Sequence, residues 1–202
     1  MNSPYRKEYS ARMKTLLDER GEENMEKIDK VLVSRDEITS FVERLGKQIT
    51  ADYQGEEIVV IGILKGAAVF LADLIRKIDC PVILDFMQVS SYCNGTESSG
   101  NVRIRKDLDH DISGKNVLIV EDIIDSGITM QSLTRVLLAR NPKSIKVCAA
   151  FDKPSRRKVD YTADYIGLEV PDEFIVGYGL DYAGKYRHLP DVCVLELIGG
   201  DQ

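Results

Sequence analysis

The architecture of the chain follows from one segment, residues 117–129, which reads Val117-Leu118-Ile119-Val120-Glu121-Asp122-Ile123-Ile124-Asp125-Ser126-Gly127-Ile128-Thr129. It opens with a short apolar, β-branched run of the kind that forms a strand buried on both faces. Two adjacent carboxylates, Glu121 and Asp122, then stand where we expect that strand to end. Because a desolvated carboxylate costs several kcal/mol unless it is paired, this acid pair predicts hydroxyls, a metal or a cation nearby.

The acid pair is followed by a turn and then by a helical pattern over residues 130–140. A glycine turn that leads into a helix presents free backbone N–H groups and the positive end of the helix dipole, which suits a phosphate. Acids for sugar hydroxyls beside amides for a phosphate predict a ribose phosphate site. The alternative is that Asp125 only caps the helix. No Gly-Lys-Ser/Thr of a Walker loop and no Gly-x-Gly-x-x-Gly of a dinucleotide site is present.

Strands and helices alternate on both sides of this segment. Residues 57–64 and 144–151 are further buried-strand patterns, and a helix is expected over residues 69–78. This alternation predicts an α/β fold, a central, mostly parallel, twisted sheet flanked by helices. Lys65 and Lys153 follow two of the strands, at the sheet edge where open α/β folds bind ligands, although each lysine could simply be solvated.

Other segments give coarser predictions. Residues 31–33 resemble a short strand, and Ser34 begins a helix whose apolar stripe is core. Residues 1–30 are polar and charged, with weak helical character at 9–17, and are interpreted as an arm. A strand over residues 81–90 precedes a polar excursion at 91–101 that is typical of a surface hairpin loop. Phe174, in an edge-strand pattern, is more typical of packing than of ligand stacking.

Composition limits the class of protein. The 202 residues, 44% of them hydrophobic, can form one substantial core, and the net charge of −6 argues against nucleic acid held by a general basic field. The four cysteines lack Cys-x-x-Cys spacing and there are two histidines, so we expect free thiols in a reducing compartment rather than zinc. With no apolar signal segment or membrane-spanning run, we expect a cytoplasmic protein without a membrane partner.

The run from Val120 to Thr129 closely resembles the phosphoribosyl diphosphate (PRPP) binding motif of type I phosphoribosyltransferases, and nearly the whole chain is similar to the hypoxanthine-guanine phosphoribosyltransferases. The resemblance implies one phosphoribosyltransferase domain over residues 1–202. Its core would span about residues 31–165, and a small hood over the base pocket would come from the N-terminal arm and about residues 166–202. It also implies Mg²⁺ as cofactor, PRPP and a 6-oxopurine as substrates, and a homodimer or homotetramer.

The resemblance assigns roles to individual residues. Asp125 would accept the purine N7 proton as the catalytic base. Ribose and 5-phosphate contacts fall on Glu121, Asp122, Asp125, Ser126, Gly127, Ile128 and Thr129. The diphosphate would meet Lys65, Gly66 and Arg187, after a Leu64-Lys65 peptide that can be cis in this family. The purine base would contact Lys153, Phe174, Ile175 and Asp181. The metal would be bound by Glu121, Asp122 and Asp181. Ser91 and Tyr92 would belong to a mobile flap.

Three positions depart from the pattern of many relatives. Ser126 stands where many have Thr, Ala67 where they have glycine, and Ile128 where they have a polar residue. The serine keeps the hydroxyl and the phosphate cradle is largely backbone, so phosphate binding should survive. The preference among hypoxanthine, guanine and xanthine stays open. A regulator that keeps this fold, senses PRPP and binds RNA or DNA is a rival reading, and it would require a basic face.

Overall fold

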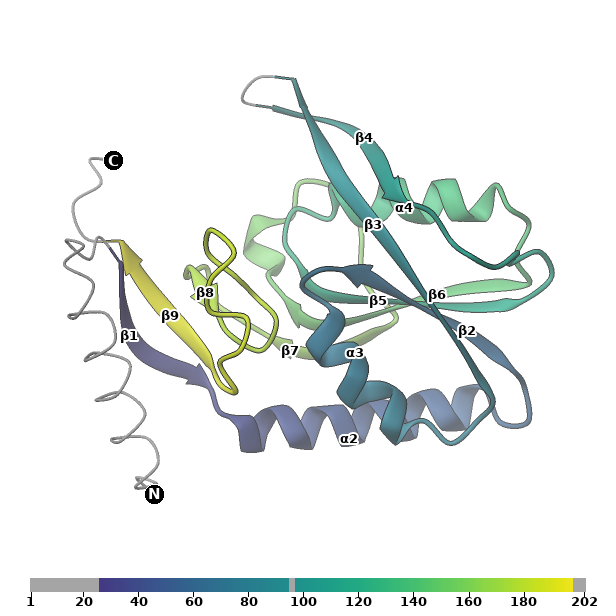
Figure 1. Ribbon diagram of the computed structural model, residues 1–202, viewed down its shortest axis with the longest axis horizontal. Coiled ribbons are helices and arrows are strands. Elements are labelled where there is room, and N and C mark those ends of the chain that lie inside the picture. Colours follow the sequence, from purple (N-terminus) through teal and green to yellow (C-terminus); the bar gives the residue numbers. More distant parts are fainter. Residues whose placement is uncertain (1–25, 95–96, 198–202) are drawn as a thin grey trace.

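A six-stranded sheet with the order β4-β3-β2-β5-β6-β7 forms the centre of the molecule (Figure 1). A computed structural model describes residues 26–94 and 97–197. Every neighbouring pair of strands in this sheet is parallel except β3 and β4, which confirms the mostly parallel sheet predicted from the sequence. The strands are β2 (Ile58–Leu64), β3 (Val82–Asn94), β4 (Glu97–Lys106), β5 (Asn116–Ile124), β6 (Ser144–Asp152) and β7 (Tyr165–Glu169).

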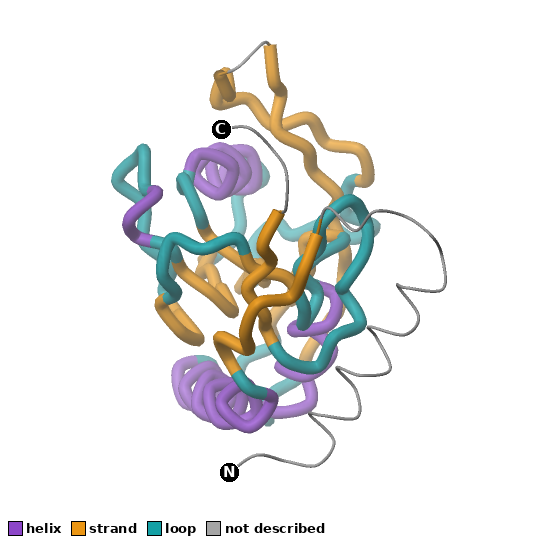
Figure 2. Tube along the Cα trace, turned by 90° about the vertical axis from the view of Figure 1, so that its left-hand side faces the viewer, coloured by secondary structure: helices purple, strands orange, loops and turns teal. Residues whose placement is uncertain are grey.

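Helices cover both faces of this sheet (Figure 2). The α-helices of the described residues are α2 (Arg35–Asp52), α3 (Ala68–Leu74) and α4 (Ile128–Leu138). Successive side chains of a strand point to opposite faces. Ile58 and Val60 therefore pack in the core formed with α2 and α3, while Val59 and Ile61 pack in the core formed with α4. The continuous apolar runs of the sequence are explained by this double burial.

The first described helix begins where its sequence predicts. The Ser34 hydroxyl accepts a hydrogen bond from the backbone N–H of Glu37, and the Glu37 carboxylate accepts one from the backbone N–H of Ser34. This reciprocal capping box fixes the start of α2. The helix expected over residues 69–78 is shorter than predicted: α3 gives way to a 3-10 turn, η1 (Ile75–Lys77).

Residues 91–101 agree with the surface hairpin expected from their composition, but their strands are longer than predicted. The β3 backbone continues through Asn94 and β4 begins at Glu97, so most of this segment is an antiparallel hairpin, with Cys93 opposite Ser98 and Asn94 opposite Glu97. The polar, glycine-spaced composition fits an edge hairpin, because antiparallel strands can carry polar side chains on a solvated face. The register shifts between Ser91 and Cys93, next to the residues assigned to the flap.

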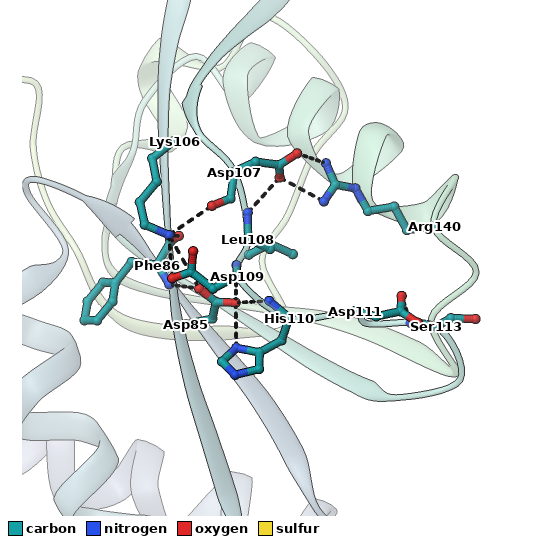
Figure 3. Close-up of polar contacts among 10 residues, drawn as sticks. All are labelled: Asp85, Phe86, Lys106, Asp107, Leu108, Asp109, His110, Asp111, Ser113 and Arg140. Atoms are coloured by element: carbon teal, nitrogen blue, oxygen red, sulfur yellow. Dashed lines mark hydrogen bonds and ion pairs between the residues drawn. The ribbon is translucent and has the colours of Figure 1, made fainter.

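A buried carboxylate anchors the base of this hairpin (Figure 3). Asp85, on β3, is 2% exposed. It accepts hydrogen bonds from the backbone N–H groups of Phe86, Asp109 and His110, and the Nδ1 atom of His110 lies 3.1 Å from its Oδ2 atom. The segment that leads from β4 towards β5 is thereby attached to β3 near the start of that strand.

A separate three-stranded sheet with the order β1-β9-β8 stands beside the central sheet (Figure 1). Its strands are β1 (Glu26–Val33), β8 (Ile175–Val176) and β9 (Val192–Leu197). β1 begins at Glu26, so the strand expected only at residues 31–33 is longer than predicted. The helical character expected at residues 9–17 lies outside the described residues. Among the described residues, no helix combines the length and the apolar character needed to cross a membrane.

Candidate active site

The strand order reverses between β2 and β5, because β3 lies on one side of this pair and β6 on the other. The pairing of β2 with β5 runs from Ile58 and Asn116 to Gly62 and Val120. Pairing of β5 with β6 continues to Ile124. In open α/β sheets, ligands bind outside the carboxyl ends of the strands at such a reversal point.

A cavity of about 300 Å³ lies at this reversal point. Of the residues assigned to ribose and phosphate, all but Ile128 line it. Val89 of the hairpin and Met130 of α4 line the same cavity. The lining residues are Ile63, Leu64, Val89, Glu121, Asp122, Ile123, Ile124, Asp125, Ser126, Gly127, Thr129 and Met130. The predicted segment therefore forms most of one continuous wall.

The acid pair lies inside β5 rather than after it, which corrects the expected strand end. The backbone continues to pair with β6 past Glu121 and Asp122, so the strand ends only at Ile124. Burial raises the pKa of Glu121 well above its usual value, and the adjacent charge of Asp122 raises it further. Two crowded carboxylates of this kind are stabilised by a cation.

The acid pair fits a magnesium ion by its donor set, because Mg²⁺ binds one or two protein carboxylates together with water and substrate oxygens. Among the described residues, no group of three or more acidic, His or Cys side chains is close enough to form a metal site from protein ligands alone. Asp181, the third residue assigned to metal, therefore does not join Glu121 and Asp122 in one cluster.

Gly66 is in close contact with the acid pair. A Cβ atom at Gly66 would lie 1.6 Å from the Oδ2 atom of Asp122, so only glycine fits there without moving that carboxylate. The preceding Leu64-Lys65 peptide is cis. Gly179 packs on the other side of this loop, since a Cβ atom there would lie 2.2 Å from the backbone oxygen of Gly66. The loop after β2 thus lies between β5 and the segment that follows β8.

The start of α4 has the form that the sequence predicts for an anion site. Gly127 is its N-cap, with a left-handed φ of 80°, and this residue makes no side-chain hydrogen bond to the helix. The backbone N–H of Ile128 is 3.4 Å from the Ser126 hydroxyl. Helix N-termini of this kind offer backbone donors and a positive partial charge.

Asp125 has an unpartnered atom beside the cavity. Its Oδ1 atom is buried and has no hydrogen-bond partner, while its Oδ2 atom lies 3.8 Å from Nη1 of Arg156. A buried acceptor without a donor is costly, so a ligand N–H group would satisfy it. Asp125 is thus not a simple helix cap.

Lys153 and Phe174, two of the residues assigned to the base, lie next to Glu173. Lys153 is 6% exposed, and its Nζ atom donates to the backbone oxygen of Glu173 at 2.6 Å. Burial lowers the pKa of Lys153, and the charge of Arg156 lowers it further. Phe174 is 47% exposed and packs edge-on against Tyr182 with the ring centroids 5.5 Å apart. A half-exposed phenylalanine has a ring face available for a planar ligand.

Arg187 and Asp181 are bound to each other. The guanidinium Nη2 atom of Arg187 lies 2.6 Å from Oδ1 of Asp181, and its Nη1 atom donates to the backbone oxygen of Gly179. Asp181 also accepts a hydrogen bond from the backbone N–H of Gly184. Ser91 and Tyr92 lie in β3, but their side chains are outside the described part of the structure.

Sequence reasoning missed the residues behind the cavity wall. Arg157 donates to the backbone oxygen of Asp125 and forms an ion pair with Asp152. In the sequence, Arg157 is one of three consecutive basic residues and resembles part of a solvated basic patch. Its partners are 32 and 5 residues away, so no local pattern reveals them.

Comparison with known proteins places this arrangement among characterised relatives. Residues 34–183 match the family model of the phosphoribosyl transferase domain. The chain is 53% identical over 169 residues to a hypoxanthine-guanine phosphoribosyltransferase of Bacillus subtilis, covering 84% of this chain and 94% of the relative. A crystal structure of a hypoxanthine phosphoribosyltransferase from Staphylococcus aureus superposes with a TM-score of 0.82 at 48% identity, covering 84% and 92% of the two chains. A hypoxanthine-guanine phosphoribosyltransferase from Bacillus anthracis, with HEPES in its active site, gives 0.80 at 49% identity, covering 84% and 98%.

Proposed function

The chain belongs to the hypoxanthine-guanine phosphoribosyltransferases of the phosphoribosyltransferase family, and from this we propose how its own residues divide the reaction. The enzyme serves purine salvage: it transfers the 5-phosphoribosyl group of PRPP to N9 of hypoxanthine or guanine, giving IMP or GMP and diphosphate. The anomeric carbon develops cationic character while a highly charged group departs. One observation carries the assignment: an acid pair, a buried carboxylate oxygen and a glycine-capped helix start meet around one cavity.

Binding of PRPP is assigned to the segment from β5 to α4. Glu121 and Asp122 hold the ribose hydroxyls, and the backbone at Ser126, Gly127 and Thr129 holds the 5-phosphate, with Ile128 completing the first turn of α4. Support comes from the left-handed N-cap Gly127, which has no side chain to compete with a ligand at the helix start. Glu121 and Asp122 are also the residues that would hold Mg²⁺, and Asp181 is the candidate for a second ion. When bound, Mg²⁺ neutralises charge on the diphosphate.

Asp125 acts as the acceptor of the purine N7 proton. Its buried Oδ1 atom without a donor supports this role, because the proton-bearing nitrogen of a purine would satisfy it. Proton removal as the N9 bond forms prevents positive charge from accumulating on the base. Asp125 contacts the reacting base in this scheme and is therefore the catalytic residue.

Base selection is assigned to Lys153 and its surroundings. Lys153 donates to the 6-oxo group, so adenine, with an amino donor at that position, would place a donor against a donor. Phe174 stacks on the purine ring, and backbone groups at Ile175 and Asp181 meet its opposite edge. The half-exposed ring of Phe174 and the buried Lys153 ammonium group support this assignment.

The diphosphate is assigned to Lys65, Gly66 and Arg187. Contact of Gly66 with Asp122 brings this loop beside the ribose site. Arg187 is paired with Asp181, so binding of diphosphate requires the guanidinium to share its donors or to turn. The β3–β4 hairpin, with Ser91 and Tyr92, is the element we expect to close over the reacting carbon and exclude water.

A spectrophotometric assay with PRPP and Mg²⁺ tests the proposal against hypoxanthine, guanine, xanthine, adenine and uracil in parallel. We expect turnover of hypoxanthine, guanine or both, little turnover of adenine, and a loss of about 10²-fold or more in kcat for Asp125→Asn. Full activity of Asp125→Asn would reject the assigned proton acceptor. Folded protein that binds PRPP but turns over no base would favour the rival regulator.

The proposal also includes the oligomeric state and the cellular location of the enzyme. We expect a homodimer or homotetramer, which light scattering after size-exclusion chromatography would establish. We also expect the enzyme in the cytoplasm, where a reducing environment suits the free thiols of Cys80 and Cys148. Fractionation of cells that express the protein tests the location.

A further inference from the structure

Three consecutive backbone carbonyls of the cavity wall are held from behind by one segment. We call residues 153–161 the strap; it follows β6 and contains the 3-10 turn η2 (Pro154–Arg156). The backbone oxygens that it holds belong to Ile124, Asp125 and Ser126. Their donors are, in order, the backbone N–H of Lys153 at 2.9 Å, Nη1 of Arg157, and the backbone N–H of Lys158 at 2.9 Å.

The direction of these three carbonyls also fixes the direction of the backbone N–H groups that follow them. In a planar trans peptide, the C=O group and the following N–H group point in opposite directions. Because the three carbonyls point to the strap, the N–H groups of Asp125, Ser126 and Gly127 point away from it. These same three residues line the cavity on their other side. The strap therefore orients the backbone donors on the cavity side of this segment.

Arg157 is the member of the strap that acts through its side chain. Two donors of the strap are backbone N–H groups, but the central carbonyl is held by the Arg157 guanidinium, which is also paired with the Asp152 carboxylate. The side chains of Arg157 and Asp152 are 16% and 6% exposed. A buried planar guanidinium with a carboxylate partner is held in one orientation, which a flexible ammonium group cannot reproduce.

The strap also packs against Gly127, the residue that follows Ser126. A Cβ atom at Gly127 would lie 3.0 Å from Cδ of Arg157 and 3.1 Å from atoms of Val159 and Tyr161. The Tyr161 hydroxyl lies 3.2 Å from the hydroxyl of Thr134 on α4. The strap thus packs against every residue from Ile124 to Gly127 and is tied to the helix that follows.

We propose that Arg157 is a positioning residue for the 5-phosphate: bridging Asp152 and the Asp125 carbonyl, it holds the peptide groups of residues 124–127 with their N–H donors directed at the phosphate. This inference rests on the proposed function, since it assigns the phosphate of the same ligand. It gives Arg157 no contact with the substrate. Its effect should therefore depend on whether the ligand carries a 5-phosphate.

The test compares IMP with inosine, which differ by the 5-phosphate, through binding to the full chain measured by calorimetry. Arg157→Met removes the guanidinium. Lys158→Met is the matched control, because it removes an equal charge from an exposed neighbour whose backbone N–H, not side chain, holds the loop. We expect Arg157→Met to weaken IMP by about tenfold or more and inosine by less than about twofold, whereas Lys158→Met keeps the wild-type ratio.

Arg157→Lys is a second variant, which retains the positive charge and can be measured if Arg157→Met fails to fold. An ammonium group lacks the planar fork with which the guanidinium reaches Asp152 and the Asp125 carbonyl through two separate nitrogens, so we expect this variant to melt cooperatively and to lose part of the preference for IMP over inosine. An unchanged preference in a folded Arg157 variant, or an equal loss in Lys158→Met, would overturn the inference. The proposed function is judged separately by the turnover of hypoxanthine and guanine by the wild-type enzyme.

Discussion

At the scale of single residues, a substitution at Gly66 is expected to weaken PRPP binding without lowering the stability of the fold. In Gly66→Ala, the new methyl group would lie within the space of the Asp122 Oδ2 atom, and the carboxylate end of a side chain is the part that can move. We expect Asp122 to turn away, the KM for PRPP to rise by about tenfold or more, and the melting temperature to change little. Steady-state kinetics and thermal unfolding measure the two effects.

Gly114→Ala is the matched control for that substitution. Gly114 has a left-handed φ of 69° and no atom within 4 Å of an added Cβ. Alanine there should cost about 1 kcal/mol in backbone strain and leave the kinetics unchanged. The two glycines are thus expected to give opposite results. Normal kinetics in Gly66→Ala would show that the loop accepts a side chain without moving Asp122.

Some residues of the site could be predicted from the sequence and others could not. Most of the wall formed by residues 121–129 could be predicted, because consecutive residues at one strand end necessarily lie together. The ion pair of Asp181 with Arg187 and the bridge formed by Arg157 could not, since each depends on side-chain positions set by tertiary packing. For the same reason, the unpartnered Oδ1 atom of Asp125 is visible only in the structure.

At the scale of elements, the capping box of α2 makes a testable contribution to stability. Ser34→Ala removes the hydroxyl that accepts from the Glu37 N–H and also donates to the Glu37 carboxylate. The free energy of unfolding should fall by about 1 kcal/mol, because a backbone donor of the first turn loses its partner. Ser40→Ala, at an exposed position of the same helix, should leave it equal or slightly higher. Equal urea midpoints for the two variants would show that the cap contributes nothing.

Elements were predicted best where burial is strongest. β2, β5 and β6 are apolar on both faces, and their sequences predict strands directly. β1 was predicted too short because its first residues alternate between partly and fully exposed positions, so they lack an apolar run. The polar residues 91–101 were expected to form a surface hairpin loop, but strand pairing continues to Asn94 and Glu97, so the strands were predicted too short. Strand pairing at an edge depends on a partner strand, which local composition does not show.

At the scale of the whole molecule, the position of the site follows from topology. The reversal of strand order between β2 and β5 brings together loops that are about sixty residues apart in the chain, and the segment after β8 closes over them through Gly179. Sequence alternation alone predicted the parallel sheet but not its strand order. The hood that the resemblance implies stays a prediction, and the pairing of β1 with β9 could not be predicted from local sequence because the two strands are far apart in the chain.

The stability of the whole molecule should depend on Asp85 in acid. Burial raises the pKa of Asp85, but hydrogen bonds from Phe86, His110 and Asp109 outweigh it, so the pKa lies below its usual value. A carboxyl group with a lower pKa in the folded state binds fewer protons there than in the unfolded chain. Its stabilising contribution is therefore complete above the unfolded-state pKa of about 3.9 and is lost as the pH falls towards the folded-state value.

Asp85→Asn should consequently lower the free energy of unfolding by about 2 kcal/mol at pH 7 and pH 5, because an amide cannot accept all the N–H groups that the carboxylate accepts. The difference between the wild type and this variant should shrink between pH 4 and pH 3, as urea unfolding at each pH would measure. Asp111→Asn is the control, since Asp111 is exposed in the same segment and accepts only the N–H of Ser113. A difference that stays constant down to pH 3 would mean that the ionised carboxylate of Asp85 does not hold the hairpin base to β3.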